Sequence, residues 1–409
     1  MAKCHLFLFK RTDLEVKNME RNLILYPAFR FFINMMIIGP ILIPFLLWKG
    51  LDYSQIMILQ SISAVSAMIF EVPTGAIADK LTRKLSLIVS GFILAVSLTV
   101  YILGNHFLFF ALAEILFGLG LTFFSGADSA ILYESLKILG REKEYQGREG
   151  AAASNIFLGQ AVFSILSGYL YVIHPTIPFW ISTVFILMAS VFAAFFSEPD
   201  RIKSQHRYVK HIYMGFCDAF KKPRIVWLLV FAALISSLMR LGYWLYQPYF
   251  DLVNVEIVYY GYIFAAMNLV AAFASKVLLK KFSQVRPRKL LLSLAVLMMI
   301  SFIIPGFFKG YWVIGVICLQ QIFRGMYPAT MKFYVNLQVS DGYRATTISM
   351  VSLISSLSFA IISPLVGLAL DQSGTQTVYR LIGVLSIIGF LTLLLLRKLQ
   401  KKKGGTINR

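Results

Sequence analysis

The sequence predicts an all-α integral membrane protein with twelve transmembrane helices in two pseudo-symmetric six-helix bundles. Composition, a regular series of apolar segments and the distribution of basic residues support this fold class. Of the 409 residues, 58% are hydrophobic and only 14% are charged, and the mean hydropathy is +0.74. A soluble domain carries roughly 25% charged residues. This chain therefore lacks the charge needed to cover a soluble core of its size.

Twelve apolar segments follow one another along the chain. A helix needs about 20 apolar residues to cross the hydrocarbon core, and each segment supplies roughly that number. The segments are 22–48, 53–73, 85–103, 107–133, 149–173, 177–196, 224–250, 257–279, 289–308, 311–333, 345–370 and 376–396. The apolar run at Leu6–Phe9 is too short for a cleavable signal peptide. We expect the first span to act as an uncleaved signal.

Lys and Arg are divided unevenly among the tails and loops. With the N-terminus inside, the tails and inner loops hold 33 of the 39 basic residues, and the outer loops hold only Lys49, Lys309 and Arg380. Such a bias sets orientation, so we expect both termini in the cytoplasm and the chain in the plasma membrane. The net charge of +20 is then an orientation signal that also attracts anionic lipid. It does not indicate a nucleic-acid partner.

The segments form two similar halves around a linker. The expected organisation is a cytoplasmic tail (1–21), a first six-helix bundle (22–197), a linker (198–222), a second six-helix bundle (223–397) and a basic tail (398–409). Apolar residues at helical spacing between Val209 and Phe220 predict an amphipathic linker helix on the inner leaflet. Two parallel six-helix halves around a central site are a known transporter plan.

Several other classes of site are not indicated. Cys4, Cys217 and Cys318 lie far apart and the five histidines are scattered, so we expect neither a disulfide framework nor a metal site. No Gly-rich phosphate loop ending in Lys-Ser/Thr is present, and no hydrolase constellation is found. We therefore expect no enzyme activity and no cofactor. A polytopic receptor or enzyme is the remote alternative.

A polar and basic motif joins the second and third segments, reading Glu71-Val-Pro-Thr-Gly-Ala-Ile-Ala-Asp-Lys-Leu-Thr-Arg-Lys84. It resembles the loop 2–3 signature of the major facilitator superfamily, with Thr82 in place of its second glycine. Its opening Glu-Val-Pro-Thr resembles a bacterial subgroup that contains many presumed exporters. The matching positions are Gly75, Asp79, Lys80, Arg83 and Lys84. The resemblance covers the whole chain and implies the fold of that superfamily and the activity of a secondary transporter.

In that superfamily the loop acts as a latch that locks the two halves together when the protein is open outward. A small residue at Gly75 lets helix ends approach, and Asp79 suits a helix N-terminus. Asp128 is expected to pair with a nearby cation, because a central acid costs roughly 2.5–3.5 kcal/mol. The candidate cations for Asp128 are Arg83, Lys84 and Arg148. The expected latch residues are Glu71, Gly75, Asp79, Arg83, Lys84, Asp128, Glu134 and Arg148.

Four charged residues lie deeper, in the spans that by the resemblance line a central cavity. Ionisable groups at depth nearly always face a bundle interior or a water cavity. Three cations and one acid predict a positive cavity for an anionic substrate group. The alternative is that the arginines pair with Asp251, Glu114 or carbonyl groups, or extend to an interface. The expected site comprises Arg30, Asn34, Glu114, Arg240, Trp244, Gln247 and Arg324.

The sequence departs from drug/proton antiporters at two motifs. Glu114 stands where many of them carry an arginine, and the Gly-Pro motif of their fifth helix is replaced by Gly159-Gln160. Glu114 is expected either to carry a coupling proton or to form a fixed salt bridge with Arg324 or Arg30. The leading expectation is a monomeric, ion-coupled exporter of a drug-, antibiotic- or peptide-like compound. The alternative is an importer of a small anionic nutrient.

Overall fold

The computed structural model describes residues 13–80, 82–199, 223–338 and 344–405, and these ranges contain helices and connecting loops with no strand. The predicted all-α fold is confirmed. The first half consists of α1 (Asp13–Asn34), the 3₁₀ helix η1 (Gly39–Ile41), α2 (Leu42–Trp48), α3 (Tyr53–Lys80), α4 (Arg83–Leu103), α5 (Phe107–Phe124), α6 (Ala127–Ile138), η2 (Glu142–Glu144), α7 (Tyr145–Ile173) and α8 (Ile177–Ala194).

The second half repeats this plan. It consists of α10 (Pro223–Leu252), α11 (Ile257–Phe273), the π-helical turn η3 (Ala274–Leu278), α12 (Leu279–Lys281), α13 (Pro287–Phe307), α14 (Trp312–Ile317), α15 (Leu319–Gln338) and α16 (Arg344–Gly405). The predicted amphipathic linker helix and both tail ends lie outside the described residues.

Ten helical stretches within the described residues are long and apolar enough to cross a membrane. One of them, Thr347–Leu395, has 49 residues and contains two predicted spans. The two spans meet at Gly374, whose φ of 74° lies in the left-handed region that glycine tolerates. The remaining predicted span corresponds to α14 and α15, which carry the polar residues Gln320, Gln321 and Arg324.

Several spans are broken within the membrane. The first breaks between α1 and α2 around Gly39-Pro40, and the fourth breaks at Gly126, whose φ is 82°. The tenth breaks at Cys318. Irregular backbone at membrane depth is tolerated where it is buried in protein or lines a cavity. Two of these breaks, at Gly39 and Cys318, lie in spans that border the cavities described below.

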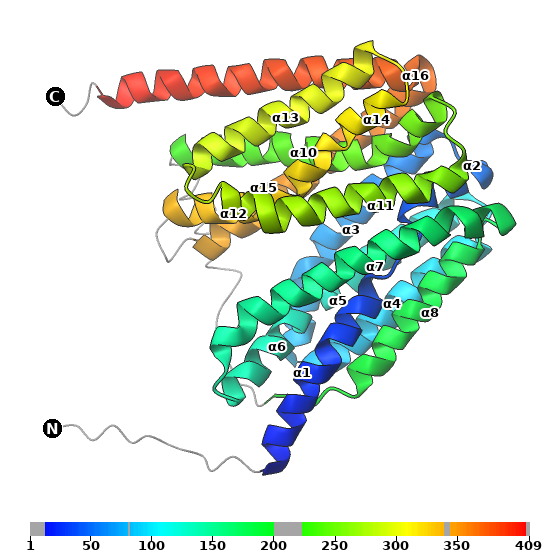
Figure 1. Cartoon of the computed structure of the whole chain (residues 1–409), viewed down its shortest axis with the longest axis vertical. Helices are drawn as coiled ribbons and strands as arrows, with labels where there is room; N and C mark the ends of the chain where they lie inside the picture. The colour runs from blue at the N-terminus through cyan, green and yellow to red at the C-terminus, as the bar shows by residue number, and fades with distance from the viewer. Residues whose placement is uncertain (1–12, 81, 200–222, 339–343, 406–409) are drawn as a thin grey trace.

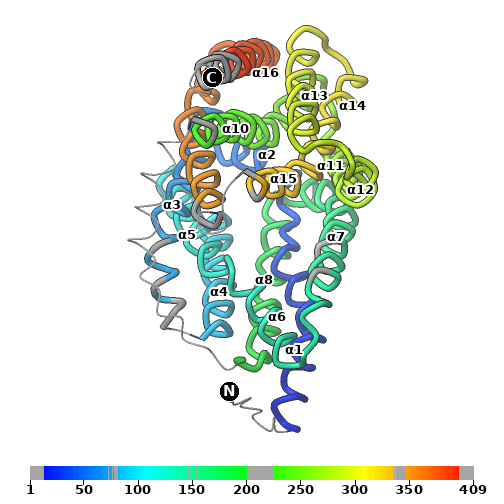
Figure 2. The backbone as a smooth tube through the Cα atoms, turned by 90° about the vertical axis from the view of Figure 1, so that its left-hand side faces the viewer, coloured from blue at the N-terminus to red at the C-terminus, as the bar shows by residue number. Residues whose placement is uncertain are grey.

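The two halves lie side by side and diverge toward the end of the molecule where α1 begins and α16 ends (Figures 1 and 2). We call this the terminal end and the opposite end the distal end. The halves contact each other mainly through α3 with α16 and α7 with α11. Small residues permit this close approach: a Cβ at Gly261 would lie 2.1 Å from the Ser164 carbonyl oxygen, and a Cβ at Gly367 would lie 2.7 Å from that of Tyr53.

Among the described residues, the terminal end of α3 lacks such close packing. A Cβ added at Gly75 would meet no atom within 4 Å, and Glu71 and Ile77 are exposed. The structure is therefore closed at the distal end and open at the terminal end.

Candidate functional site

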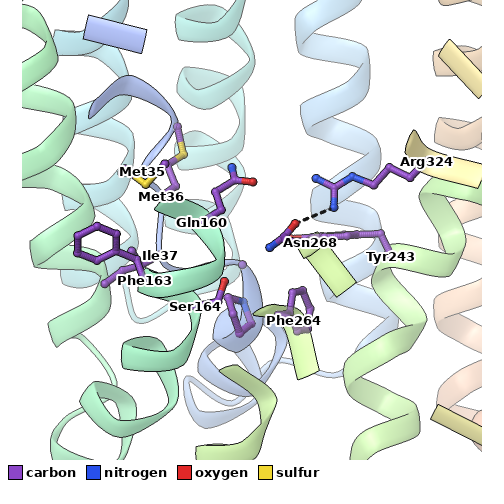
Figure 3. A pocket seen from close by; sticks show the side chains of 12 residues that line it. Met35, Met36, Ile37, Gln160, Phe163, Ser164, Tyr243, Phe264, Asn268 and Arg324 are labelled. Atoms are coloured by element: carbon purple, nitrogen blue, oxygen red, sulfur yellow. Dashed lines mark hydrogen bonds between the residues drawn. The ribbon is translucent and has the colours of Figure 1, made fainter. Parts of the chain in front are cut away.

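A cavity of about 80 Å³ lies where the two halves meet (Figure 3). The first half contributes the break after α1 and one face of α7, and the second half contributes α10, α11 and α15. The lining residues are Met35, Met36, Ile37, Gly39, Pro40, Gln160, Phe163, Ser164, Tyr243, Phe264, Asn268 and Arg324. We call this space the central cavity. Since both halves form its wall, a relative movement of the halves changes its shape.

Polar groups on facing walls are already organised. The Arg324 guanidinium donates to the Asn268 Oδ1 at 3.2 Å and to the Gln321 Oε1 at 3.3 Å. On the opposite wall the Gln160 amide donates to the Asn34 carbonyl oxygen at 3.3 Å. Figure 3 shows Gln160 and the Asn268–Arg324 pair on opposite sides of the space. Hydrogen-bonding groups are therefore presented to the central cavity from both halves.

A second cavity of about 210 Å³ adjoins the first within the second half. Its lining comes from α10 and α15: Met239, Arg240, Tyr243, Trp244, Tyr246, Gln320 and Arg324. We call it the arginine cavity. Tyr243 and Arg324 line both spaces, so the two cavities are neighbours. Arg240, Trp244 and Arg324, all expected at the site, lie together here.

Arg30 lies elsewhere, in a cluster inside the first half. Its guanidinium forms ion pairs with Asp128 and with Glu149, the latter at 3.2 Å, and stacks 5.6 Å from the centre of the Phe124 ring. Two carboxylates neutralise it, so it adds no free positive charge to a cavity. The expected pairing of Asp128 with Arg83, Lys84 or Arg148 is wrong. Its partner is Arg30, which lies on α1.

Glu114 is buried, with 4% of its surface exposed, but it lines neither cavity. Its carboxylate accepts a hydrogen bond from the Gln60 Nε2 at 3.0 Å and another from the Tyr101 hydroxyl. These partners lie on α3 and α4, so Glu114 faces the interior of the first half. The expected salt bridge to Arg324 or Arg30 is wrong. No residue of α5 lines either cavity, so the expectation that this span contributes to the site is wrong for both cavities.

Gln247 and Asn34 form hydrogen bonds beside the central cavity. The Gln247 side chain donates to the Gly39 carbonyl oxygen at 2.6 Å and accepts from the Ile43 amide at 3.2 Å. It therefore ties α10 to the broken first span across the two halves. The Asn34 side chain donates to the Arg30 carbonyl oxygen at 2.9 Å and lines neither cavity.

The latch residues form separate contacts within the first half. Arg83 pairs with Glu134 at 2.5 Å, and Arg148 pairs with Glu144 at 2.9 Å. The backbone amides of Arg83 and Lys84 donate to the Glu198 carboxylate at 2.8 and 3.0 Å. The Asp79 side chain lies outside the described residues. The described contacts tie α4 to α6 and to the segment that follows α8, and none of them joins the two halves.

Sequence reasoning missed three uncharged polar residues that line the cavities, Gln160, Ser164 and Gln320. A census restricted to charges does not detect them. A usable signal existed on α15, where Gln320, Gln321 and Arg324 interrupt an apolar span.

Comparisons with known proteins agree with this architecture. The profile of the Major Facilitator Superfamily matches residues 28–319 and 260–408. An uncharacterized MFS-type transporter of Bacillus subtilis, YxaM, is 24% identical over 363 residues, covering 82% of this chain and 87% of that protein. The sucrose permease of Escherichia coli is 23% identical over 372 residues, covering 85% of each chain.

Solved structures share the fold. A point mutant of the nucleoside transporter NupG has a TM-score of 0.79 at 14% identity, covering 93% of this chain and 100% of that one. A bacterial homologue of the lysosomal transporter Spinster, in an inward-facing and unoccupied conformation, has a TM-score of 0.68 at 15% identity, covering 94% and 96%. With its membrane helices, its two bundles and a family profile that spans both, the chain belongs to the Major Facilitator Superfamily and is a transporter, not an enzyme.

Proposed function

We propose that the chain is a secondary active transporter that carries a small organic solute by alternating access, with the central and arginine cavities as its substrate site. The observation that carries this proposal is the position of the central cavity, which lies between two halves that are packed at one end and apart at the other. In transporters built from paired repeats, rocking of the halves around a midplane site exposes it to each side in turn.

We assign the terminal end to the cytoplasm, because the tails and loops at that end hold most of the Lys and Arg residues. The structure is then open inward. A cysteine at exposed Lys143, in the connection between α6 and α7, should be labelled only from the inside. A cysteine at exposed Lys309, beyond α13, should be labelled only from the outside. The reverse labelling pattern would overturn the assignment.

For direction, we propose proton-coupled export, on the resemblance of the loop at 71–84 to bacterial exporters. Uptake is the second candidate. It is favoured by the hydrogen-bonding groups Gln160, Ser164 and Asn268 in the central cavity and by the similarity to a sucrose permease. A site lined with such groups suits a polar solute better than a large apolar drug.

The test is transport by purified protein in liposomes with an imposed pH gradient of either sign. The panel should contain sucrose, a nucleoside, small carboxylates, a phosphate ester and lipophilic cationic drugs. Gradient-driven movement of one class, with counterflow of the same compound, would support the proposal and give the direction. Asn268→Ala should weaken transport, because Arg324 loses a partner. Exposed Ser293→Ala on α13 is the control. Absence of counterflow across the panel would contradict the proposal.

A further inference from the structure

Gln320 on α15 is a buried amide without a hydrogen-bond partner. Its side chain is 1% exposed, and among the described residues neither Oε1 nor Nε2 has a partner. Leaving a buried donor or acceptor unpaired destabilises the folded state. The amide lies against α10, where a Cβ built at Gly242 would be 2.1 Å from the Oε1. Gln320 therefore borders the arginine cavity with an unused donor and an unused acceptor.

Two cations border the same cavity without an acidic partner. Within the described ranges, neither Arg240 nor Arg324 forms a salt bridge. Arg324 is bonded only to neutral amides and faces the Phe157 ring at 6.0 Å. Arg240 faces the Phe359 ring at 5.6 Å. Cation–π contacts of this kind compensate only part of the cost of holding a cation in the membrane.

Arg30 provides the contrast within the same chain. It lies at membrane depth in the first half, and two carboxylates neutralise it. This arginine, which lines neither cavity, is thus paired with carboxylates of the protein itself. At the arginine cavity the described residues provide two cations without a carboxylate partner and one amide without a hydrogen-bond partner, a set that an anion from outside the protein would complement.

We propose that the arginine cavity binds the oxyanion of a small organic anion, a carboxylate or a phosphate, during transport. This deepens the proposed function by naming its substrate class, and it rests on that function. Guanidinium groups present paired donors that match either oxyanion. Gln320 then pairs with a neighbouring donor and acceptor of the substrate, and Trp244 and Tyr243 pack against its apolar part. The arginine cavity, of about 210 Å³, has room for a small molecule.

The experiment uses the purified full-length protein in detergent and follows its unfolding temperature. The probes are benzoate, phenyl phosphate and benzamide, the last being a neutral analogue of similar shape. A compound that binds the folded state raises the unfolding temperature in a saturable manner. We expect saturable stabilisation by benzoate or phenyl phosphate and none by benzamide. The anion with the larger response identifies the oxyanion. This comparison needs no variant, so it does not depend on whether a substituted protein folds.

Variants then locate the site. Arg240→Gln and Arg324→Gln should each weaken binding of the responding anion roughly tenfold or more, because each removes a charge-assisted hydrogen bond. Gln320→Leu should weaken it by a smaller factor. The control is Arg286→Gln, which removes the same charge from an exposed position before α13 and should leave binding unchanged.

Three results would overturn the proposal: equal stabilisation by benzamide, an equal loss in Arg286→Gln, or no saturable response to either anion. Each of them leaves transport open to direct measurement, since counterflow of another solute class in liposomes would still demonstrate a transporter. Failure of the substrate class is therefore distinguishable from failure of the proposed function.

Discussion

The carboxylate of Asp371 on α16 caps the first turn of α3 by accepting a hydrogen bond from the Ser54 amide at 2.8 Å. It also accepts from the Tyr53 amide at 3.0 Å and from the Ser54 hydroxyl at 2.5 Å. A carboxylate at this position satisfies free N–H groups and interacts favourably with the helix dipole. Because Asp371 belongs to the second half and α3 to the first, this cap exists only while the distal end is closed.

Asp371→Asn should shift the protein toward the state that is open at the distal end. Asparagine keeps one acceptor oxygen but loses the negative charge at the helix N-terminus, which costs about 0.3–1 kcal/mol and corresponds to a change of up to roughly fivefold in the ratio of the two states. The readout is outside labelling of a cysteine at Met57, in a cysteine-free background. Met57 is 1% exposed and packs in the core of the second half. Faster labelling is expected in Asp371→Asn.

The matched control is Asp52→Asn. Asp52 also caps α3, accepting from the Gln55 amide at 2.7 Å, but it lies in the same half as that helix. Its loss should lower stability without changing Met57 labelling. Equal labelling rates in the two variants would contradict a gating role for Asp371.

Gly261→Ala should also shift the protein toward the state that is open at the distal end, in this case because the new methyl group disturbs the packing between the halves. The new Cβ would lie 2.1 Å from the Ser164 carbonyl oxygen, where α11 meets α7. Overpacking costs roughly 1–3 kcal/mol, and backbone on both sides leaves little room to relax. Met57 labelling should therefore increase roughly fivefold or more. The control is Gly389→Ala, whose Cβ would be 3.6 Å from Leu234. If Met57 labelling in Gly261→Ala is unchanged from wild type, the contact between Gly261 and Ser164 is not part of the gate.

Asp79→Asn should lower the turnover rate more than it weakens substrate binding. Asp79 lies at the end of α3, in the loop expected to lock the halves in the outward-open state, and that end lies away from both cavities. Measurements of kcat and KM in liposomes separate the two effects, with exposed Asp13→Asn as the control. A rise in KM with unchanged kcat would place Asp79 in binding instead.

The fold was largely predictable because the bilayer imposes it. Apolar length defines the spans, and each predicted span lies mostly in helix in the structure. The breaks within spans were harder to predict. Gly39-Pro40 and Gly126 are visible as helix breakers, but whether a membrane helix kinks or ends at such residues depends on what its neighbours supply.

The site was only partly predictable, because a census of charged residues in the spans does not show which of them face a cavity. Arg324 and Arg240 do line a cavity, whereas Arg30 and Glu114 face the interior of their own half. In an apolar span, periodicity does not distinguish a face toward lipid from one toward a neighbouring helix. Uncharged groups such as Gln320 also take part in the proposed chemistry, and only the tertiary packing shows that its amide is unpaired among the described residues.

Glu114→Gln tests the proposed coupling proton. No cation pairs with Glu114 among the described residues, so it can gain or lose a proton without breaking a salt bridge. The amide oxygen of a glutamine can still accept from Gln60 and Tyr101, so the variant should fold and exchange substrate. Gradient-driven flux should fall at least tenfold, because the carrier group is gone. Exposed Glu142→Gln should retain flux. Full gradient-driven flux in Glu114→Gln would exclude Glu114 as the carrier, and joint loss of expression and exchange would instead make it a structural residue.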